Sequence, residues 1–299
     1  MAVTELAGEA PLPRGERVTL PDRGTTFVRT VPGPPGAPTV LLLHGWIASG
    51  GLNWYTAFTP LAQRYTVIAP DMRGHGRGIR TRRRFRLADC ADDMAALLEH
   101  VGAGPAIVVG YSMGGPIAQL LWRRHEESVA GLVMCATAHR FVTGARERFV
   151  FSSMMATAAG TTRAGHLLSR APMASVRRWA PAASASRPAT FRAWAAAEMR
   201  RHDVVKIMEA GQALGSYNAS AWIGDVDVPT TVIVTERDRA IAPSEQRLLA
   251  SRIPGAIVHT VDDGHMACAK REFGTALVRA VDSVHTRAAD AAGARAVAR

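Results

Sequence analysis

The chain has 299 residues, of which 47% are hydrophobic and 20% charged, a composition typical of a globular protein with a large core. Its formal net charge is +11, but no zinc-finger or RNA-binding motif accompanies the charge, so we do not expect a nucleic-acid partner. Its 3 cysteines stand far apart without a Cys-x-x-Cys pair. This spacing argues against a disulfide framework or a structural zinc site and favours a reducing compartment.

The first residues do not look like a secretory signal. Residues 1–17 have no basic start and no apolar centre, and Glu5 and Glu9 interrupt them. No apolar run of the sequence approaches the ~18 residues that a membrane span needs. We therefore expect a cytoplasmic protein without a transmembrane segment, in which residues 1–17 form an N-terminal extension.

From residue 18 onward, short apolar runs alternate with segments of helical periodicity. Residues 18–20 and 25–31, separated by a short turn, predict a β-hairpin. Residues 39–43 are apolar almost throughout, as expected for a strand that is buried on both faces. Further strands are predicted at residues 66–69, 106–109 and 129–136, and helices near residues 54–64, 87–101 and 116–122.

The alternation stops between about residues 139 and 217. This segment is rich in Ala, Met, Phe and Trp, has helix-like patterning and is broken by Pro172, Pro181 and Pro188. Residues 285–299 are rich in Ala and Arg without an apolar face, and we expect a flexible tail there. Before that tail the alternation returns, with strands predicted at residues 230–234 and 256–261 and helices at residues 244–252 and 267–284.

These patterns predict a doubly wound α/β fold. Strands that alternate with helices form a mostly parallel sheet covered on both faces, here opened by an antiparallel hairpin. We assign residues 18–138 and 218–284 to this core. Residues 139–217 interrupt the core between two strands, so we expect a helical cap over the carboxyl ends of the strands, where ligands bind in open α/β sheets.

A turn with a serine at its apex follows the strand predicted at residues 106–109. Residues 110–115 have the sequence GYSMGG and lie between a strand and a helix, which is the context of a nucleophile elbow. Glycines at positions 110 and 114 fit this motif because strand and helix pass too closely there for larger side chains. Ser112 is therefore the candidate nucleophile.

A serine nucleophile needs a base and an acid that orients the base. His265 is the candidate base, because it follows the last predicted strand and precedes the closing helix. Asp238 is the candidate acid, because it lies just beyond another strand. Its competitors in the neighbouring loops are Glu236, Asp262 and Asp263.

An oxyanion site needs two backbone N–H groups aimed at the developing negative charge. We assign them to Met113, the residue after the nucleophile, and to Trp46, which follows the end of an earlier strand. Gly45 allows the backbone to approach the substrate closely. We interpret His44 as a residue that braces this loop by hydrogen bonding rather than as a catalytic residue.

Four motifs in this order resemble the α/β-hydrolase superfamily, specifically its serine lipases and esterases with a cap insertion. They are LHGW at residues 43–46, DMRGHG at residues 71–76, GYSMGG at residues 110–115, and Asp238 followed by His265. The order Ser, Asp, His is that of the superfamily. Two positions depart from its usual pattern, Gly78 where a serine is common and Thr235 where a glycine is common. Neither position supplies a catalytic atom.

The resemblance implies acyl transfer, because a serine stands where dehalogenases and typical epoxide hydrolases of this fold have an aspartate. We expect a serine hydrolase acting on esters of a small or medium apolar acyl group, such as a monoacylglycerol-like lipid, with no metal or organic cofactor. A thioesterase, a carbon–carbon bond hydrolase and a cofactor-free perhydrolase use the same residues and stay open as alternatives. So does a hydrolase-like ligand-binding or sensing protein with little turnover.

The expected cap supplies apolar side chains that suit an apolar acyl group. The substrate pocket is expected to include Tyr111, Met154, Met155, Trp194 and Met266. Residues 139–217 also contain 12 Arg and Lys against 4 Asp and Glu, and a second basic cluster lies within residues 80–86. We expect most of these arginines at the surface, with attraction of anionic esters, of acyl-thioester carriers or of an anionic membrane as an alternative role.

Overall fold

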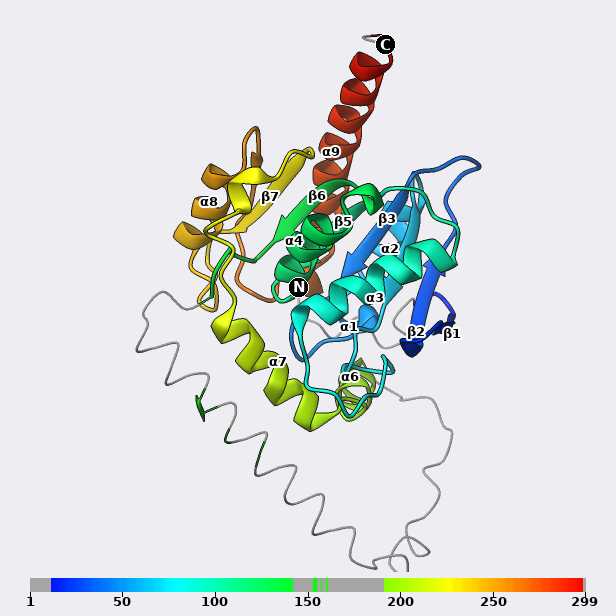
Figure 1. The fold of residues 1–299 in the computed structure, drawn as a ribbon, viewed down its shortest axis with the longest axis vertical. Coiled ribbons are helices and arrows are strands. Elements are labelled where there is room, and N and C mark those ends of the chain that lie inside the picture. The colour runs from blue at the N-terminus through cyan, green and yellow to red at the C-terminus, as the bar shows by residue number, and fades with distance from the viewer. Residues whose placement is uncertain (1–11, 142–152, 155–156, 158–159, 161–190, 298–299) are drawn as a thin grey trace, which may run out of the picture.

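One sheet forms the centre of the molecule (Figure 1). A computed structural model of the chain describes residues 12–141, 153, 154, 157, 160 and 191–297. The strands are β1 (Gly15–Leu20), β2 (Gly24–Val31), β3 (Thr39–Leu43), β4 (Thr66–Pro70), β5 (Ala106–Tyr111), β6 (Val129–Cys135), β7 (Thr230–Thr235) and β8 (Ile257–Val261). Their order in the sheet is β1-β2-β4-β3-β5-β6-β7-β8. β1 and β2 form an antiparallel hairpin, β2 pairs antiparallel with β4, and the remaining neighbours are parallel, as predicted.

Helices cover both faces of the sheet (Figure 1). They are α1 (Gly50–Trp54), α2 (Phe58–Ala62), α3 (Leu87–His100), α4 (Gly114–Arg124), α6 (Phe191–Met199), α7 (Val204–Ser216), α8 (Pro243–Arg252) and α9 (Arg271–Val297), with short 3-10 turns η2 (Glu126–Ser128), η4 (Ile223–Asp225) and η5 (Ala267–Ala269). Alternation along β3 explains the two layers: Leu41 and Leu43 join the core formed with α3 and α4, and Val40 and Leu42 join the core formed with α2 and α9. Among the described residues, none of the helices is long and apolar enough to cross a membrane.

The segment predicted as one helix near residues 54–64 forms two short helices. α1 begins after Ser49, whose side chain accepts a hydrogen bond from the N–H of Leu52 as an N-cap. α2 carries Pro60 at its third residue. Proline is tolerated in the first turn of a helix but not in its interior, so a single continuous helix through this segment is disfavoured.

The last helix is longer than the sequence predicts. We expected it to end near residue 284 and to be followed by a flexible tail, but α9 continues through residues 285–297 and projects beyond the sheet (Figure 1). Its earlier part is fixed by side chains such as Leu277 and Val281, which are fully buried. A nucleated helix adds one hydrogen bond per residue, and Ala and Arg have high helix propensities. The extension therefore needs no apolar face.

The segment predicted as a cap is described in part. α6, α7 and Met154 belong to it, whereas Met155 and most of residues 142–190 lie outside the described residues. The backbone N–H of Asp203, the N-cap of α7, donates to the carbonyl of Gly74 at 2.9 Å. The indole N–H of Trp46 donates to the carbonyl of Ile207 at 2.8 Å. These bonds attach α7 to the loops that follow β3 and β4.

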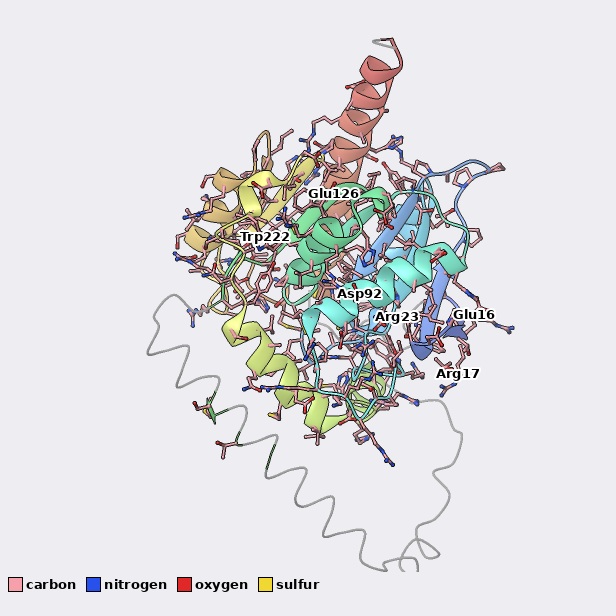
Figure 2. The ribbon with its side chains drawn as sticks, in the orientation of Figure 1. Glu16, Arg17, Arg23, Asp92, Glu126 and Trp222 are labelled. Carbon is pink, nitrogen blue, oxygen red and sulfur yellow. The ribbon has the colours of Figure 1, made fainter. Side chains whose placement is uncertain are left out.

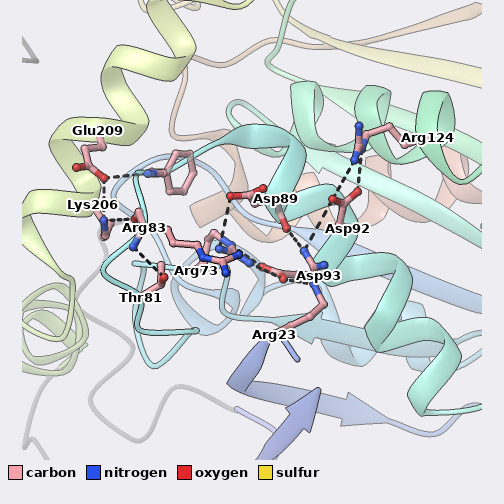
Figure 3. A network of polar contacts seen from close by, with 11 residues as sticks. Arg23, Arg73, Thr81, Arg83, Asp89, Asp92, Asp93, Arg124, Lys206 and Glu209 are labelled. Atoms are coloured by element: carbon pink, nitrogen blue, oxygen red, sulfur yellow. Dashed lines mark hydrogen bonds and ion pairs between the residues drawn. The ribbon is translucent and has the colours of Figure 1, made fainter. Parts of the chain in front are cut away.

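A buried ion pair also holds α7 (Figure 3). The charged atoms of Lys206 and Glu209 are 2.9 Å apart, and the two side chains are only 4% and 3% exposed. The Lys206 ammonium donates to the carbonyl of Arg83, and the Glu209 carboxylate accepts from the N–H of Phe85. Gly74 permits the close approach, because a Cβ there would lie 2.3 Å from Cβ of Lys206. The loop before α3 therefore fixes the position of α7.

Candidate active site

The turn after β5 has the strained geometry of a nucleophile elbow. Ser112 has a φ of 51°, in the left-handed region that non-glycine residues seldom adopt. Its N–H donates to the carbonyl of Cys135 at 2.9 Å, and the Thr137 hydroxyl donates to its carbonyl at 2.8 Å. A Cβ at Gly110 would lie 2.5 Å from the Gly114 carbonyl oxygen, so strand and helix touch as the sequence predicts. The elbow is thereby held with the serine at its apex.

Ser112, His265 and Asp238 form one hydrogen-bonded chain. The Ser112 hydroxyl lies 3.0 Å from Nε2 of His265, and Nδ1 of His265 lies 2.8 Å from Oδ2 of Asp238. The three residues follow β5, β8 and β7, so their convergence comes from the parallel order of these strands. Ser112 and Asp238 are buried, while the His265 side chain is 26% exposed. The arrangement allows Nδ1–H to donate to Asp238 while Nε2 accepts from the serine.

The hydrogen bonds around the Asp238 carboxylate favour its ionised form. Its Oδ1 accepts from the N–H groups of Ala240 and Ile241 at 2.8 and 2.9 Å, and its Oδ2 also accepts from the Thr235 hydroxyl at 2.8 Å. Burial alone would raise the pKa of this carboxyl, but the hydrogen bonds from His265 and Ile241 outweigh burial, and the pKa is lowered. Thr235, which stands where the superfamily often has glycine, thus supports the acid.

The competing carboxylates are engaged elsewhere. Glu236 pairs with Arg247. Asp262 pairs with Arg237 at 3.0 Å, and the ion pair of Asp263 with Lys270 measures 2.7 Å. Of these candidates, Asp238 is the carboxylate in contact with the His265 imidazole.

A residue that the sequence reasoning missed completes the acid loop. The Gln246 side chain of α8 accepts from the N–H of Thr235 at 3.0 Å and donates to the Thr235 hydroxyl at 2.9 Å. Its Nε2 also lies 3.3 Å from Oδ2 of Asp238. Gln246 is fully buried, which the sequence does not reveal, because burial of a polar residue on this helix depends on the tertiary structure.

Met113 directly follows the serine, and the loop that carries Trp46 approaches the serine from the end of β3. A Cβ at Gly45, the neighbour of Trp46, would lie 3.4 Å from Cβ of Ser112, so the loop after β3 touches the elbow. Gly45 is held there by its N–H, which donates to the side chain of Asn53 at 2.9 Å. Within the described residues, the backbone N–H groups of Trp46 and Met113 have no recorded acceptor. Both donors are thus available to a substrate oxygen.

His44 braces this loop, as the sequence predicts. Its Nδ1 lies 2.8 Å from the Gly45 carbonyl, and its Nε2 accepts from the N–H of Met72 at 2.9 Å. Burial is the main cause that holds the pKa of His44 well below its usual value, so the ring is neutral, as an accepting Nε2 requires. The Asp71 carboxylate adds two further bonds, from the N–H groups of Gly50 and Arg77, each at 2.8 Å. The loops after β3 and β4 therefore form one rigid support.

Tyr111 was predicted to line the substrate pocket, and this prediction is wrong. The side chain is only 2% exposed and lies in the core on the α9 side of the sheet, with its ring T-shaped against Trp54 and Phe273. Because side chains alternate along a strand, Tyr111 points away from the face that its neighbours in β5 occupy. Its hydroxyl donates to the carbonyl of His265 at 2.8 Å. This hydrogen bond connects Tyr111 to the backbone of His265, the candidate base.

The other predicted pocket residues differ in their exposure and in their neighbours. Trp194 packs its ring 6.2 Å from that of Tyr55 and 5.3 Å from that of Phe191. Met266, next to His265 in the chain, is 69% exposed, and Met154 is 55% exposed. Met155 lies outside the described residues. Tyr55 and Phe191, which the sequence reasoning missed, extend the aromatic group around Trp194.

Tyr55 connects this aromatic group to the loop that carries the base. Its hydroxyl donates to the carbonyl of Ala269 at 2.6 Å, and the hydroxyl of the neighbouring Thr56 donates to the carbonyl of Cys268 at 2.8 Å. Residues 268 and 269 belong to η5, directly after His265. The aromatic side chains of α6 therefore lie against a segment that also supports the base.

Two curated proteins match parts of this chain. The magnesium-chelatase 30 kDa subunit of Rhodobacter capsulatus is 45% identical over 87 residues, which are 29% of this chain and 30% of that protein. The lipase LipV of Mycobacterium tuberculosis is 34% identical over 125 residues, which are 42% of this chain and 46% of the lipase. The chain thus spans less than half the length of these curated relatives.

A solved structure and a family model cover far more of the chain. A thermophilic esterase from Thermogutta terrifontis superposes with a TM-score of 0.69 at 20% identity, over 91% of this chain and 99% of that chain. At this identity the likeness shows the fold alone. A family model described as the alpha/beta hydrolase fold matches residues 38–271, a range that includes the elbow and both of its partners. From the strand order, the elbow and this match, the chain belongs to the alpha/beta hydrolase fold family.

Proposed function

We propose that the protein is a serine hydrolase that cleaves esters of a small or medium apolar acyl group through an acyl-enzyme intermediate. The observation that carries the proposal is the chain from Ser112 Oγ through His265 to Asp238, with lengths of 3.0 and 2.8 Å. A serine hydroxyl is a weak nucleophile until a base takes its proton. This chain of residues supplies the base and the carboxylate that orients it.

In the first half of the reaction, Ser112 Oγ attacks the ester carbonyl carbon while Nε2 of His265 takes the hydroxyl proton. The N–H groups of Met113 and Trp46 donate to the negative oxygen of the tetrahedral intermediate. His265 then gives the proton to the leaving alcohol, and the acyl group remains on Ser112. Asp238 keeps the imidazole proton on Nδ1 and stabilises the charged ring.

In the second half, a water molecule takes the place of the alcohol. His265 accepts one proton from the water as its oxygen adds to the acyl carbonyl. The same two N–H groups stabilise the second tetrahedral intermediate. When it collapses, the carboxylic acid leaves and the proton returns to Ser112.

The surroundings of the relay support an apolar acyl group. Trp194 lies with Tyr55 and Phe191 in one aromatic group, and Met266 adjoins the base with 69% of its surface exposed. Aromatic and flexible Met side chains suit apolar ligands of varied shape. One of the curated relatives is named as a lipase, which favours the same class of substrate.

Other reactions use the same three residues. A thioesterase and a carbon–carbon bond hydrolase differ from an esterase in the bond that is cleaved. A cofactor-free perhydrolase differs in the molecule that attacks the acyl group on the serine. A ligand-binding or sensing protein without turnover belongs to another class. The intact relay of Ser112, His265 and Asp238 disfavours it, because binding without turnover has no need of an activated serine.

The nucleophile is tested by labelling with a fluorophosphonate probe. We expect the wild type to be labelled covalently and Ser112→Ala to remain unlabelled. Ser251→Ala is a matched control, because its hydroxyl lies on the exposed side of α8 and donates to the carbonyl of Leu248. Absence of labelling in the wild type, or equal labelling of Ser112→Ala, contradicts the proposal.

The bond type is tested with p-nitrophenyl esters of increasing chain length and thioesters of the same acyl groups. We expect esters of short and medium chains to be hydrolysed, with Ser112→Ala at least about 10³-fold slower. Faster turnover of the thioesters identifies a thioesterase instead. If no substrate is turned over faster than by Ser112→Ala, the protein is better explained as a binding protein.

A further inference from the structure

A cavity rich in arginine lies outside the candidate active site. Its volume is about 480 Å³, and none of the residues that line it carries a carboxylate. The lining residues are Arg17, Thr25, Gly76, Arg77, Gly78, Arg80 and Arg201. None of the residues assigned to catalysis or to the oxyanion site is among them.

The four arginines come from different parts of the fold. Arg17 lies on β1 at the edge of the sheet (Figure 2), and Arg77 and Arg80 belong to the loop after β4. Arg201 follows α6 in the segment predicted as a cap. Glu16 precedes Arg17, but successive side chains of a strand point to opposite faces, and Glu16 does not line the cavity. The cavity therefore lies between the core and the predicted cap.

Among the described residues, two of these arginines form an ion pair, and both pair with the same carboxylate. Glu198, which is 2% exposed, accepts from both terminal nitrogens of Arg77 at 3.0 and 2.6 Å. The same carboxylate lies 3.2 Å from Nε of Arg201. Arg80 donates to backbone carbonyls, among them that of Arg201. Arg77 and Arg201 thus share the Glu198 carboxylate, and among the described residues Arg17 and Arg80 form no ion pair, which leaves an excess of positive charge around the cavity.

Several donors at the cavity wall are unused. Within the described residues, Arg17 has no recorded hydrogen bond or ion pair, and the terminal nitrogens of Arg201 have none either. Clustered like charges repel each other unless an anion lies between them. The bidentate pair of Arg77 with Glu198 shows that one planar carboxylate saturates one guanidinium. The unused donors approach from two separate segments, β1 and the residues after α6, and suit an anion with several acceptor oxygens and more than one charge.

We propose that this cavity binds a phosphate group, either as inorganic phosphate or as the monoester of a small organic molecule. The bound group accepts hydrogen bonds from Arg17 and Arg201 and offsets the excess positive charge. Because Arg17 belongs to the core and Arg201 to the predicted cap, the phosphate links the two and stabilises the folded protein. This site is distinct from the candidate nucleophile Ser112.

The test is thermal unfolding of the full chain in inorganic phosphate or in glycerol 3-phosphate, each against sodium chloride at the same ionic strength. We expect the Tm to rise by about 2–3 °C at a tenfold excess over Kd, because the ligand binds only the folded state. Arg17→Gln and Arg201→Gln should lose most of this rise. Arg82→Gln is the matched control, because Arg82 is exposed and does not line the cavity.

The two anions separate the possible sources of the phosphate group. A similar rise with both identifies the phosphate group itself as the ligand, and a rise with glycerol 3-phosphate alone identifies an organic monoester. No rise with either anion, or an equal rise in all variants, overturns the proposal. The readout is stability in a buffer without ester, so a failure of the serine-hydrolase proposal leaves this test intact.

Discussion

Tyr111 links the candidate nucleophile to the candidate base. It directly precedes Ser112, and its hydroxyl donates to the carbonyl of His265 at 2.8 Å. The ring packs in the core, with its centroid 6.0 Å from the ring centroid of Trp54 and 5.6 Å from that of Phe273. The loop of the base is thereby tied to the strand of the nucleophile, and the distance between their reacting atoms depends on this bond.

We predict that Tyr111→Phe lowers kcat about tenfold with little change in KM. The substitution keeps the ring but leaves the His265 carbonyl without its donor, and a displaced imidazole weakens proton transfer rather than substrate binding. A tenfold loss corresponds to about 1.4 kcal/mol of transition-state stabilisation. The measurement is steady-state hydrolysis of the best ester found in the substrate panel.

Tyr217→Phe is the matched control for this prediction. Tyr217 is also buried, and its hydroxyl donates to the side chain of Gln119 at 2.9 Å, away from the relay. Both variants lose one buried hydrogen bond, so both lower stability by a similar amount. An equal loss of kcat in the two variants would show that Tyr111 acts only through stability.

At the scale of elements, α7 is fixed by charges as well as by packing. Lys206 and Glu209 are both nearly inaccessible, and each also bonds to the loop that leads into α3 (Figure 3). A second buried network ties that loop to α3, where both oxygens of Asp93 accept from Arg73 at 2.6 and 2.7 Å. The predicted cap is therefore joined to the core by ionic contacts that are shielded from solvent.

We predict that Lys206→Met lowers the free energy of unfolding by about 3 kcal/mol, because it removes the ammonium group that the buried Glu209 carboxylate contacts at 2.9 Å. The double variant Lys206→Met/Glu209→Gln should recover part of this loss, since it also removes the buried negative charge. Urea denaturation measures both effects.

The control is the exposed pair of Arg123 and Asp225, whose side chains are 46% and 58% exposed at a distance of 3.4 Å. Asp225→Asn should cost less than about 1 kcal/mol, because solvent screens such pairs. If Lys206→Met costs no more than Asp225→Asn, the buried pair does not hold α7.

At the scale of the whole molecule, three histidines lie in a row between the core and the predicted cap. The ring centroids of His44 and His75 are 5.3 Å apart, and those of His75 and His202 are 5.7 Å apart. Nδ1 of His202 accepts from the N–H of Gly76 at 2.8 Å. Burial is the main cause that lowers the pKa of each ring, in His75 to about 3. All three rings are therefore neutral at pH 7.

We predict that the protein loses stability as the pH falls below about 6.5, the pKa of an unfolded histidine. Below that value the unfolded chain binds a proton that the folded His75 does not, so unfolding is favoured, down to the folded pKa of about 3. For His75 the loss at pH 5 relative to pH 7.5 is about 2 kcal/mol. Urea denaturation at the two pH values measures it.

His75→Gln should reduce this dependence on pH, even if the variant is less stable at pH 7.5. His100→Gln is the control, because His100 is exposed at the end of α3 and its removal should leave the dependence unchanged. A wild type with the same unfolding free energy at both pH values would contradict the prediction.

The sequence by itself predicted the fold and the candidate relay residues, with Asp238 as the favoured acid among several carboxylates. Strand and helix periods are local, so the alternation along residues 39–136 and 230–261 was enough to predict a mostly parallel sheet. Ser112 was fixed by the glycines around it, because only small residues fit where strand and helix touch. His265 and Asp238 followed from the rule that ligating and catalytic groups gather beyond the carboxyl ends of parallel strands.

Only the tertiary structure decided which neighbours act on these residues. Asp238 contacts His265, whereas Glu236 pairs with Arg247. Tyr111 lies in the core because its side chain extends from the face of β5 that is covered by α9. The arginine cavity likewise joins Arg17 and Arg201, which stand far apart in the chain. Such contacts depend on how distant segments meet, and no local pattern of the sequence records them.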